Sequence, residues 1–365
     1  MKRHTLSIVL TLVLGLALSA TEPATNPPES HRIENVPFHP MMEGFCAMTS
    51  LWMNLEYYGT AVEVATLLNL GWSHGLFYWK TPERTWIYPN TGPVEEIVHA
   101  APLFGYEARE FKHDTIEAAR RTIVDHVSRD IPVIVQWIGH TVLAVGYEKY
   151  GEVVIVHNPG EPRSAMVLDG SRPGWQDSRA YERHDTARWQ TPPFSWGVFG
   201  YHCIVVRPTT RRIAIDWKAV WRRSADKTLG RIQDPYPALY GLKGLRVLID
   251  DCRQASFDTD DERTVFLMNF EGLFFLGSGF RREAAAFLAG AAAITNDGAL
   301  TEASRAFRDS THLCRRGYNL LLKLREKQVD AALVHRAVLD LLEKFHDAEK
   351  RGAEALMRAS ASDRG

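Results

Sequence analysis

The sequence has almost no excess of charge of either sign and no run of basic residues. Its 365 residues include 43 Lys and Arg against 44 Asp and Glu, which gives a formal net charge of −1 at pH 7. Proteins that bind nucleic acid use clustered cations to neutralise phosphates. The composition therefore argues against a nucleic-acid partner, and it favours small partners that are uncharged or of mixed charge.

Cysteine is also scarce, and the cysteines lie far apart. None of them forms a CxxC pair or a Cys/His pair with the spacing of a zinc site. We therefore expect no metal and no disulfide framework. If the first cysteine is a free nucleophile, the other three leave room for one disulfide and one buried thiol, and the sequence does not set the pairing. The four are Cys46, Cys203, Cys252 and Cys314.

Two short motifs lack the residues that would make them cofactor or ion sites. Gly277-Ser278-Gly279 has no third glycine of a dinucleotide-binding loop, and Asp258-Thr259-Asp260-Asp261 has neither the Gly nor the distal Glu of a calcium loop. We interpret both as solvent-exposed loops and expect no cofactor.

The chain has only one long hydrophobic run, and it lies at the start. Residues 6–18 follow Lys2 and Arg3, and the run ends within Ala17-Leu18-Ser19-Ala20, which is rich in small residues. This order is typical of a secretory signal peptide, and the run is shorter than the roughly 20 residues that a membrane-spanning helix needs. We predict a signal peptide over residues 1–20, a mobile leader over 21–40, and an extracytoplasmic mature chain, periplasmic or secreted, without a membrane span.

A cysteine at the start of a predicted helix is the first candidate for chemistry. Apolar residues at helical spacing follow Cys46, and Gly59 is a plausible end of the helix. The unpaired N–H groups and the positive end of the helix dipole favour the thiolate form of a cysteine there. Cys46 is therefore a candidate nucleophile, although a free cysteine is as often a small buried core residue.

A predicted β-hairpin supplies partners for that thiol. A three-residue loop at Lys149-Tyr150-Gly151 would pair Glu148 with Glu152 and place Val142 opposite Asn158. Asn158 would then lie diagonally across from His140, close enough to orient its imidazole as a base for Cys46. Among the other histidines, His157 points to the opposite face and is discounted, whereas His74 and the pair His202 and Cys203 remain competitors.

The remaining pattern predicts helices first, then an antiparallel sheet, then helices only. The aromatic residues 72–79 form either core or the wall of a cleft, and the connection 169–200 is long enough to be a flap. These features predict an α+β domain over residues 41–208 and an all-helical domain over 216–360. The expected helices are 62–69, one from Pro93, 115–129 capped by Asp114, 281–294, 300–325 and 329–357, and the expected strands are 131–138, 140–148, 152–157, 163–168 and 201–206.

Three segments of the N-terminal half resemble the N-terminal domain of the butirosin-biosynthesis protein H family. They are residues 46–59, Leu70-Gly71-Trp72 with Gly75-Leu76-Phe77-Tyr78, and residues 139–147. That family looks like a branch of the papain-like cysteine enzymes and is distantly similar to the double-glycine peptidase domains of bacteriocin exporters. Residues 236–242 and 281–288 are similar to the helical domain that commonly follows it.

The resemblance implies a papain-like cysteine enzyme that forms an acyl-thioester, with Cys46 as nucleophile, His140 as general base and Asn158 as orienter. Papain-like enzymes usually carry a Gln six residues before the cysteine to bind the oxyanion, and Pro40 occupies that position here. Glu43 is nearby, but an ionised carboxylate would repel an oxyanion. The backbone N–H of Cys46 is the one donor that the sequence nominates.

Three functions follow as expectations. The first is an exported enzyme that hydrolyses or transfers the acyl group of a small-molecule or peptide amide or ester, with an amine as a further acceptor. The second is the carrier-protein-dependent N-acyltransferase of the family prototype, which a signal peptide disfavours because such carriers are cytoplasmic. The third is a catalytically silent module that binds a peptide or glycan. Oligomeric state is left open.

Overall fold

The computed structural model describes residues 26–39, 45–70, 77–80, 85–88, 93–137, 140–159, 182–185, 201–209, 214–232, 239–255 and 258–362. Within these ranges, the side chains of residues 64, 65, 77–80, 85–88, 93–95, 137, 140 and 182–185 are not described. The predicted signal peptide, the predicted strand 163–168 and most of the connection 169–200 lie outside the described residues.

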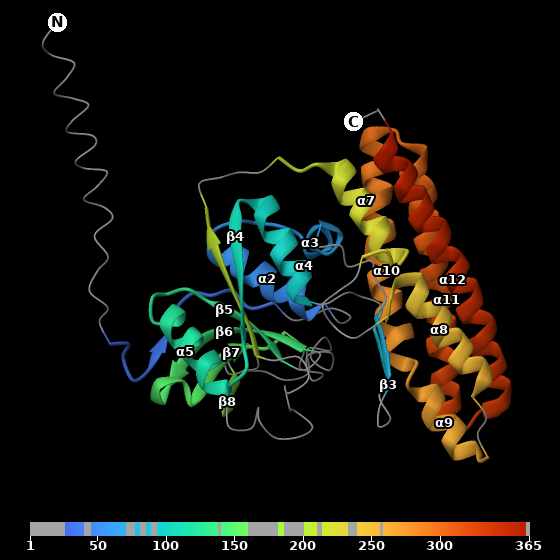
Figure 1. Ribbon diagram of the computed structural model, residues 1–365, viewed down its shortest axis with the longest axis horizontal. Coiled ribbons are helices and arrows are strands. Elements are labelled where there is room, and N and C mark those ends of the chain that lie inside the picture. The colour runs from blue at the N-terminus through green and yellow to red at the C-terminus, as the bar shows by residue number, and fades with distance from the viewer. Residues whose placement is uncertain are drawn as a thin grey trace, which may run out of the picture.

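The N-terminal half is a mixture of short helices and strands (Figure 1). Its elements are β1 (His31–Arg32), α2 (Cys46–Tyr57), α3 (Val64–Leu70), β2 (Phe77–Lys80), β3 (Thr85–Tyr88), α4 (Pro93–Ala100), the 3-10 helix η1 (Ala101–Phe104), β4 (Tyr106–His113), α5 (Ile116–Val127), β5 (Val133–Trp137), β6 (His140–Glu148), the 3-10 turn η2 (Lys149–Gly151), β7 (Val153–His157), β8 (Glu182–Asp185) and β9 (Tyr201–Pro208).

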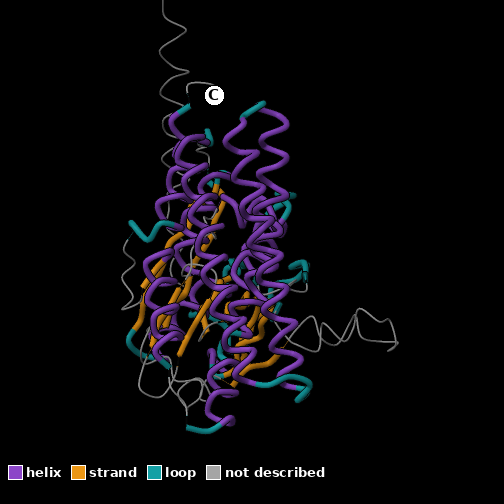
Figure 2. Tube along the Cα trace, turned by 90° about the vertical axis from the view of Figure 1, so that its right-hand side faces the viewer, coloured by secondary structure: helices purple, strands orange, loops and turns teal. Residues whose placement is uncertain are grey.

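Helices fill the C-terminal half. They are α7 (Trp217–Thr228), α8 (Gly241–Gln254), α9 (Asp260–Met268), α10 (Glu271–Thr295), α11 (Gly298–Arg325) and α12 (Ala331–Ala361), with the short strand β10 (Leu239–Tyr240) before α8. In the view of Figure 2 these helices lie in front of the strands of the N-terminal half. The predicted fold class, an α+β domain followed by a helical region, is confirmed.

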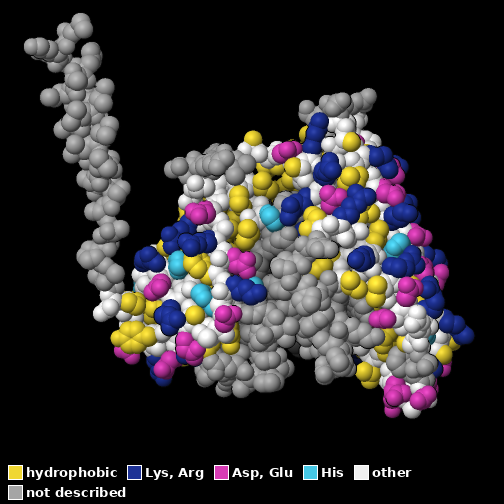
Figure 3. Space-filling view, in the orientation of Figure 1, with side chains coloured by type: hydrophobic (Ala, Val, Ile, Leu, Met, Phe, Trp, Pro, Cys, Tyr) yellow, Lys and Arg dark blue, Asp and Glu magenta, His cyan; other side chains and the backbone are white. Residues whose placement is uncertain are grey.

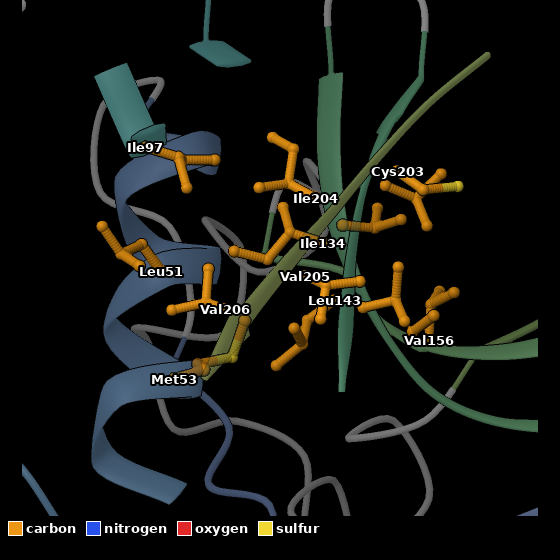
Figure 4. Close-up of a cluster of buried hydrophobic side chains, with 14 of the residues drawn as sticks. Leu51, Met53, Ile97, Ile134, Leu143, Val156, Cys203, Ile204, Val205 and Val206 are labelled. Atoms are coloured by element: carbon orange, nitrogen blue, oxygen red, sulfur yellow. The ribbon is translucent and has the colours of Figure 1, made fainter. Parts of the chain in front are cut away.

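In the described part of the chain, seven strands form one antiparallel sheet in the order β4-β9-β5-β6-β7-β8, and β1 pairs with β6 beyond the end of β5. Ile134 of β5 lies opposite Ile204 of β9, so both side chains lie on one face. Figure 4 shows these two and Val206 turned toward α2, where Leu51 and Met53 lie. Cys203 points to the other face, where its thiol lies 4.0 Å from the carbonyl oxygen of Ala119 in α5.

The turn between β6 and β7 differs from the prediction. Glu148 pairs with Val153 instead of Glu152, so the loop has one residue more than expected. Lys149, Tyr150 and Gly151 all have positive φ angles, of 49°, 53° and 92°. The predicted three-residue loop with a single left-handed glycine is therefore wrong, because the turn winds through three left-handed residues.

A β-bulge in β6 compensates for the longer loop. The register shifts by one residue between Ala144 and Gly146, and from there Leu143 lies opposite His157. Continued by one residue, this register brings Val142 opposite Asn158, as the sequence analysis expected. An extra residue in the loop and an extra residue in the strand cancel each other.

Several strands lacked a prediction. β4 alternates between inward and outward side chains but was not recognised, and it is the edge strand next to β9. The predicted aromatic loop ends in β2, whose backbone pairs with β3 and with β10 from the helical half in a separate three-stranded sheet. β2 and β10 are about 160 residues apart in the sequence. Their pairing leaves no local periodicity from which it could be predicted.

Side-chain caps set the starts of four helices in the C-terminal half. The side chains of Asp216, Thr259, Asp297 and Asp330 each accept a backbone N–H from the first turn. Thr259 and Glu262 form a reciprocal capping box, which explains the acidic cluster there. In the N-terminal half, Thr115 caps α5 in place of the predicted Asp114.

Helix α10 begins ten residues earlier than predicted. Gly277, Ser278 and Gly279 lie within this helix, so the prediction of an exposed loop is wrong. Both glycines are buried. The helix continues through residues of low helical propensity because its apolar neighbours bury area against the rest of the protein, and tertiary packing outweighs local propensity.

A buried ion pair joins α10 to α12. The guanidinium of Arg281 donates from Nε to Glu349 Oε1 at 2.8 Å and from Nη2 to Glu349 Oε2 at 2.7 Å. The two side chains are 0% and 3% exposed. A buried pair of this kind adds little stability over an apolar pair, but removing one partner leaves an uncompensated charge in the core. It therefore fixes how α10 is oriented against α12.

We predict that Glu349→Ala lowers the free energy of unfolding by about 3–5 kcal/mol, because Arg281 would stay buried without its partner. Urea denaturation of the full chain measures this. Glu302→Ala is the matched control, since Glu302 pairs with Arg358 at the surface, where both side chains are more than half exposed, and it should cost no more than about 1 kcal/mol. Equal losses in both variants would contradict the assignment.

Candidate active site

Cys46 is the first residue of α2. The preceding residue, Phe45, is the N-cap and makes no side-chain cap hydrogen bond. Phe45 is also buried, so the first turn of the helix starts from inside the protein. The Cys46 side chain itself is partly exposed. The helix start therefore presents a partly accessible thiol beside backbone N–H groups that this N-cap side chain does not occupy.

The helix that carries Cys46 is more buried than the sequence suggests. The predicted pattern was an amphipathic helix with one apolar face, but eight of its twelve residues are buried, including Thr49, Ser50 and Asn54. The sheet covers one side of α2, and α3 and α4 pack alongside it. The ring of His39 stacks on that of Trp52, with the ring centroids 3.7 Å apart. Because α2 is surrounded, its position is determined by several neighbours at once.

A hydrogen bond ties this helix to the strand that carries His140. The Ser50 hydroxyl, one turn after Cys46, donates to the backbone oxygen of Thr141 at 3.3 Å. His140 is the preceding residue and begins β6, where it pairs with Trp137, the last residue of β5. One helical turn is about 5.4 Å long, so the backbones of Cys46 and His140 lie at the same end of the sheet. The side chain of His140 lies outside the described residues.

Asn158 directly follows β7, which ends at His157. Its side chain is partly exposed. In the register of β6 and β7, Asn158 is the next residue after the pair Leu143 and His157, so it lies at the same end of the sheet as His140. The structure thus brings the backbones of Cys46, His140 and Asn158 to the same end of the sheet.

His157 has a structural environment. Its Nδ1 lies 3.1 Å from the carbonyl oxygen of Pro37, to which it donates, and the ring of Phe38 packs edge-on against it. Burial lowers the pKa of His157 to about 4, and the hydrogen bond to Pro37 opposes this shift only in part. The imidazole is therefore neutral at pH 7, as expected for a residue that anchors the N-terminal segment to the sheet.

The competing pair, His202 and Cys203, does not form a site. The two residues are neighbours on β9 and point to opposite faces. His202 Nδ1 donates to the carboxylate of Glu110 on β4, whereas the Cys203 thiol lies against α5. Burial raises the pKa of Cys203 to about 12. This cysteine is therefore a thiol at neutral pH, and no imidazole on its own face of β9 adjoins it in sequence.

The structure adds one polar residue that the sequence analysis missed. Gln136 pairs with Thr141 across the hairpin and lies on the face that α2 covers. Gln136 Oε1 and the Thr141 hydroxyl are both buried and lack hydrogen-bond partners among the described residues. A buried, unsatisfied amide is costly and often marks a site for water or a ligand. A polar residue at an inward position of an apolar strand was the available signal.

The approach to Cys46, including Pro40 and Glu43, and the competitor His74 lie outside the described residues. No group of three or more His, Cys, Asp or Glu side chains in the described ranges could hold a metal ion. Likewise, none of the described helices is both long and apolar enough to cross a membrane. Figure 3 shows acidic and basic side chains interspersed over the described part of the face in view.

Comparisons with known proteins support the cysteine-enzyme interpretation. Residues 33–183 match the family model described as Peptidase_C39 like family, which spans less than half of the chain. The N-terminal half is thus similar to C39 cysteine peptidases. This match supports the predicted relationship to double-glycine peptidases, and the resemblance to butirosin-biosynthesis protein H stays a prediction.

Among solved structures, the peptidase domain of Streptococcus ComA, a bi-functional ABC transporter involved in a quorum-sensing pathway, is 18% identical. It covers 48% of this chain and 100% of its own chain, with a TM-score of 0.31. The search of curated proteins returns no match.

We predict that iodoacetamide at neutral pH labels Cys46 faster than the other three cysteines. None of the four cysteines forms a disulfide, and the other three are buried. Burial raises the pKa of Cys203 and of Cys252 to about 12 and raises that of Cys314 as well. Mass spectrometry of tryptic peptides after short exposures measures the rates. Preferential labelling of Cys203 would place the reactive thiol on β9 instead.

Proposed function

We propose that this protein is an enzyme that forms an acyl-thioester on Cys46 and releases the acyl group to water or to an amine. The observation that carries the proposal is the hydrogen bond from Ser50 to Thr141. This bond joins α2, the helix that begins with Cys46, to Thr141, the residue after His140. It supports the proposal because a nucleophile and its base must be held close together to react.

The roles follow from the chemistry of each group. The Cys46 sulfur attacks the carbonyl carbon of an amide or ester, and His140 takes the thiol proton and passes it to the leaving amine or alcohol. Asn158 orients the imidazole through a hydrogen bond. Water or an amine then attacks the thioester, loses a proton to His140 and releases Cys46. The backbone N–H of Cys46 donates to the oxyanion in both steps.

An amine acceptor would give the helical half a role in the reaction. That half packs directly on the start of α2, because Phe280 of α10 contacts Phe45. Water needs only an open site, whereas a chosen amine needs a surface that holds it and limits access of water. We propose that the helical half and the connection 169–200 form this surface on the side of residues 72–79.

The decisive measurement is acyl-enzyme formation. With p-nitrophenyl acetate as probe, we expect intact-mass spectrometry to detect an acetyl adduct on Cys46. The adduct should be absent in Cys46→Ala, and its formation should slow by about 100-fold or more in His140→Gln, since a general base contributes 10²–10⁴-fold. Asn158→Ala should slow it less, and Asn158→Asp should retain more activity than Asn158→Ala.

Product partition then separates hydrolysis from transfer. Glycine amide or an aminoglycoside added at rising concentration should divert the acetyl group from free acid to amide. Acetate as the sole product at every concentration would leave a plain hydrolase. An adduct formed only from S-acetyl-pantetheine would favour the carrier-dependent transferase, and no adduct from either probe would favour a silent binding module.

We also propose that the mature protein is exported, on the grounds of the predicted signal peptide. Expression of the full sequence in a bacterial host should yield periplasmic or secreted protein whose N-terminus lies near residues 20–21. Edman sequencing of the purified product checks this. Exported material that retains Met1 would contradict cleavage, and protein confined to the cytoplasm would contradict export.

A further inference from the structure

Phe45 has a contact that comes from the far half of the chain. Its ring packs edge-to-face against Phe280 of α10, with centroids 4.6 Å apart and an interplanar angle of 84°. The two side chains are 3% and 4% exposed. Phe45 is the residue before Cys46, so this contact lies at the backbone that begins the helix of the nucleophile.

Phe280 belongs to the core of the N-terminal half although its helix belongs to the C-terminal half. It is buried within the same apolar cluster as α2 and the sheet, and Leu276, one turn earlier on α10, packs against that cluster. Phe274, on the same helix, is buried in a different cluster within the helical half. Residues 276 and 280 on one side of α10 therefore form part of the hydrophobic core of the N-terminal half.

The residue after Phe280 holds this side of α10 in place. Arg281 forms the two-bond ion pair with Glu349 of α12, and both side chains are buried. Rotation of α10 would break both bonds and leave a buried charge. Consecutive residues thus join α10 to α12 and to the start of α2.

The start of α2 has two such supports. Ser50 ties the end of its first turn to β6, and Phe45 rests on Phe280. Its N-cap provides no side-chain hydrogen bond of its own. In a hydrophobic staple, the residue before the N-cap packs on the first turns of its own helix and so fixes the entry angle of the chain. Apolar packing at Phe45, the N-cap itself, acts in a comparable way. Here the packing partner is a residue 235 positions away instead of one within the helix.

We propose that Phe280 is a positioning residue that holds the first turn of α2 so that the Cys46 thiol meets its base and the helix N–H groups. The proposal rests on Cys46 being the nucleophile. It makes the helical half a part of the active site, because loss of the ring lets the backbone at residues 45 and 46 shift. Misplacement of reacting groups by about 1 Å can cost up to 10²-fold in rate.

The test compares two leucine substitutions on the same helix in the full-length protein. Phe280→Leu keeps the site apolar but removes the ring edge from Phe45, and Phe274→Leu is the matched control, because Phe274 is fully buried in the other cluster. We expect Phe280→Leu to lower kcat for p-nitrophenyl acetate by about 10-fold or more, with KM changed less than about twofold. Its Cys46 alkylation rate should fall in parallel.

Phe274→Leu should lower the melting temperature and leave kcat and the alkylation rate within about twofold of wild type. Phe280→Tyr, which restores a ring, should recover most of the rate lost in Phe280→Leu. Equal kinetic effects of the two leucine variants, or an unchanged kcat and alkylation rate in Phe280→Leu, would overturn the proposal. Alkylation needs no substrate, so it remains a readout if p-nitrophenyl acetate is turned over poorly.

The activity of Cys46→Ala separates this proposal from the proposed function. If Cys46→Ala retains full activity, the proposed nucleophile is wrong and the positioning role falls with it. If Cys46→Ala is inactive and Phe280→Leu behaves as wild type, the nucleophile stands and only the positioning role is wrong.

Discussion

The position of the first turn of α2 is the constraint on which the proposed chemistry depends. A thiol at a helix start is useful only if the helix is held still relative to its base, because binding and orientation supply much of a catalytic rate. Ser50 holds the turn against β6 and Phe45 holds it against α10. Both contacts are buried, so the helix start cannot move without opening the core on one side or the other.

Helix α10 connects the two halves physically. Its early residues belong to the apolar cluster that includes α8 and α11. Phe280 belongs to the cluster of α2 and the sheet. Its later residues belong to a third cluster, with α7, the start of α11 and the end of α12. Leu70 of α3 reaches into this last cluster from the other side. The halves therefore share their cores, and a change in the bundle can reach the site through packing alone.

Burial also separates the four cysteines into two kinds. Three thiols lie within the sheet or the helix bundle, where the low dielectric disfavours a thiolate, and one lies partly exposed at a helix start. Burial also lowers the pKa of His157, whose neutral ring donates to Pro37. His202 has a different environment, because it donates to Glu110 on the edge strand. Burial thus leaves Cys46 as the cysteine that is accessible to a reagent.

The sequence by itself determined the elements with strong local signals: the Cys46 helix, the strands on either side of residues 149–152, and the long helices after Asp216. These depend on periodicity and capping, which act over a few residues. Only the tertiary structure decided the bulge that restores the register before Asn158, the partners that His202 and Cys203 meet on the two faces of the sheet, and the helical state of residues 277–279. It also decided that Phe280 adjoins Phe45, because contacts between distant residues arise from packing and leave no local pattern.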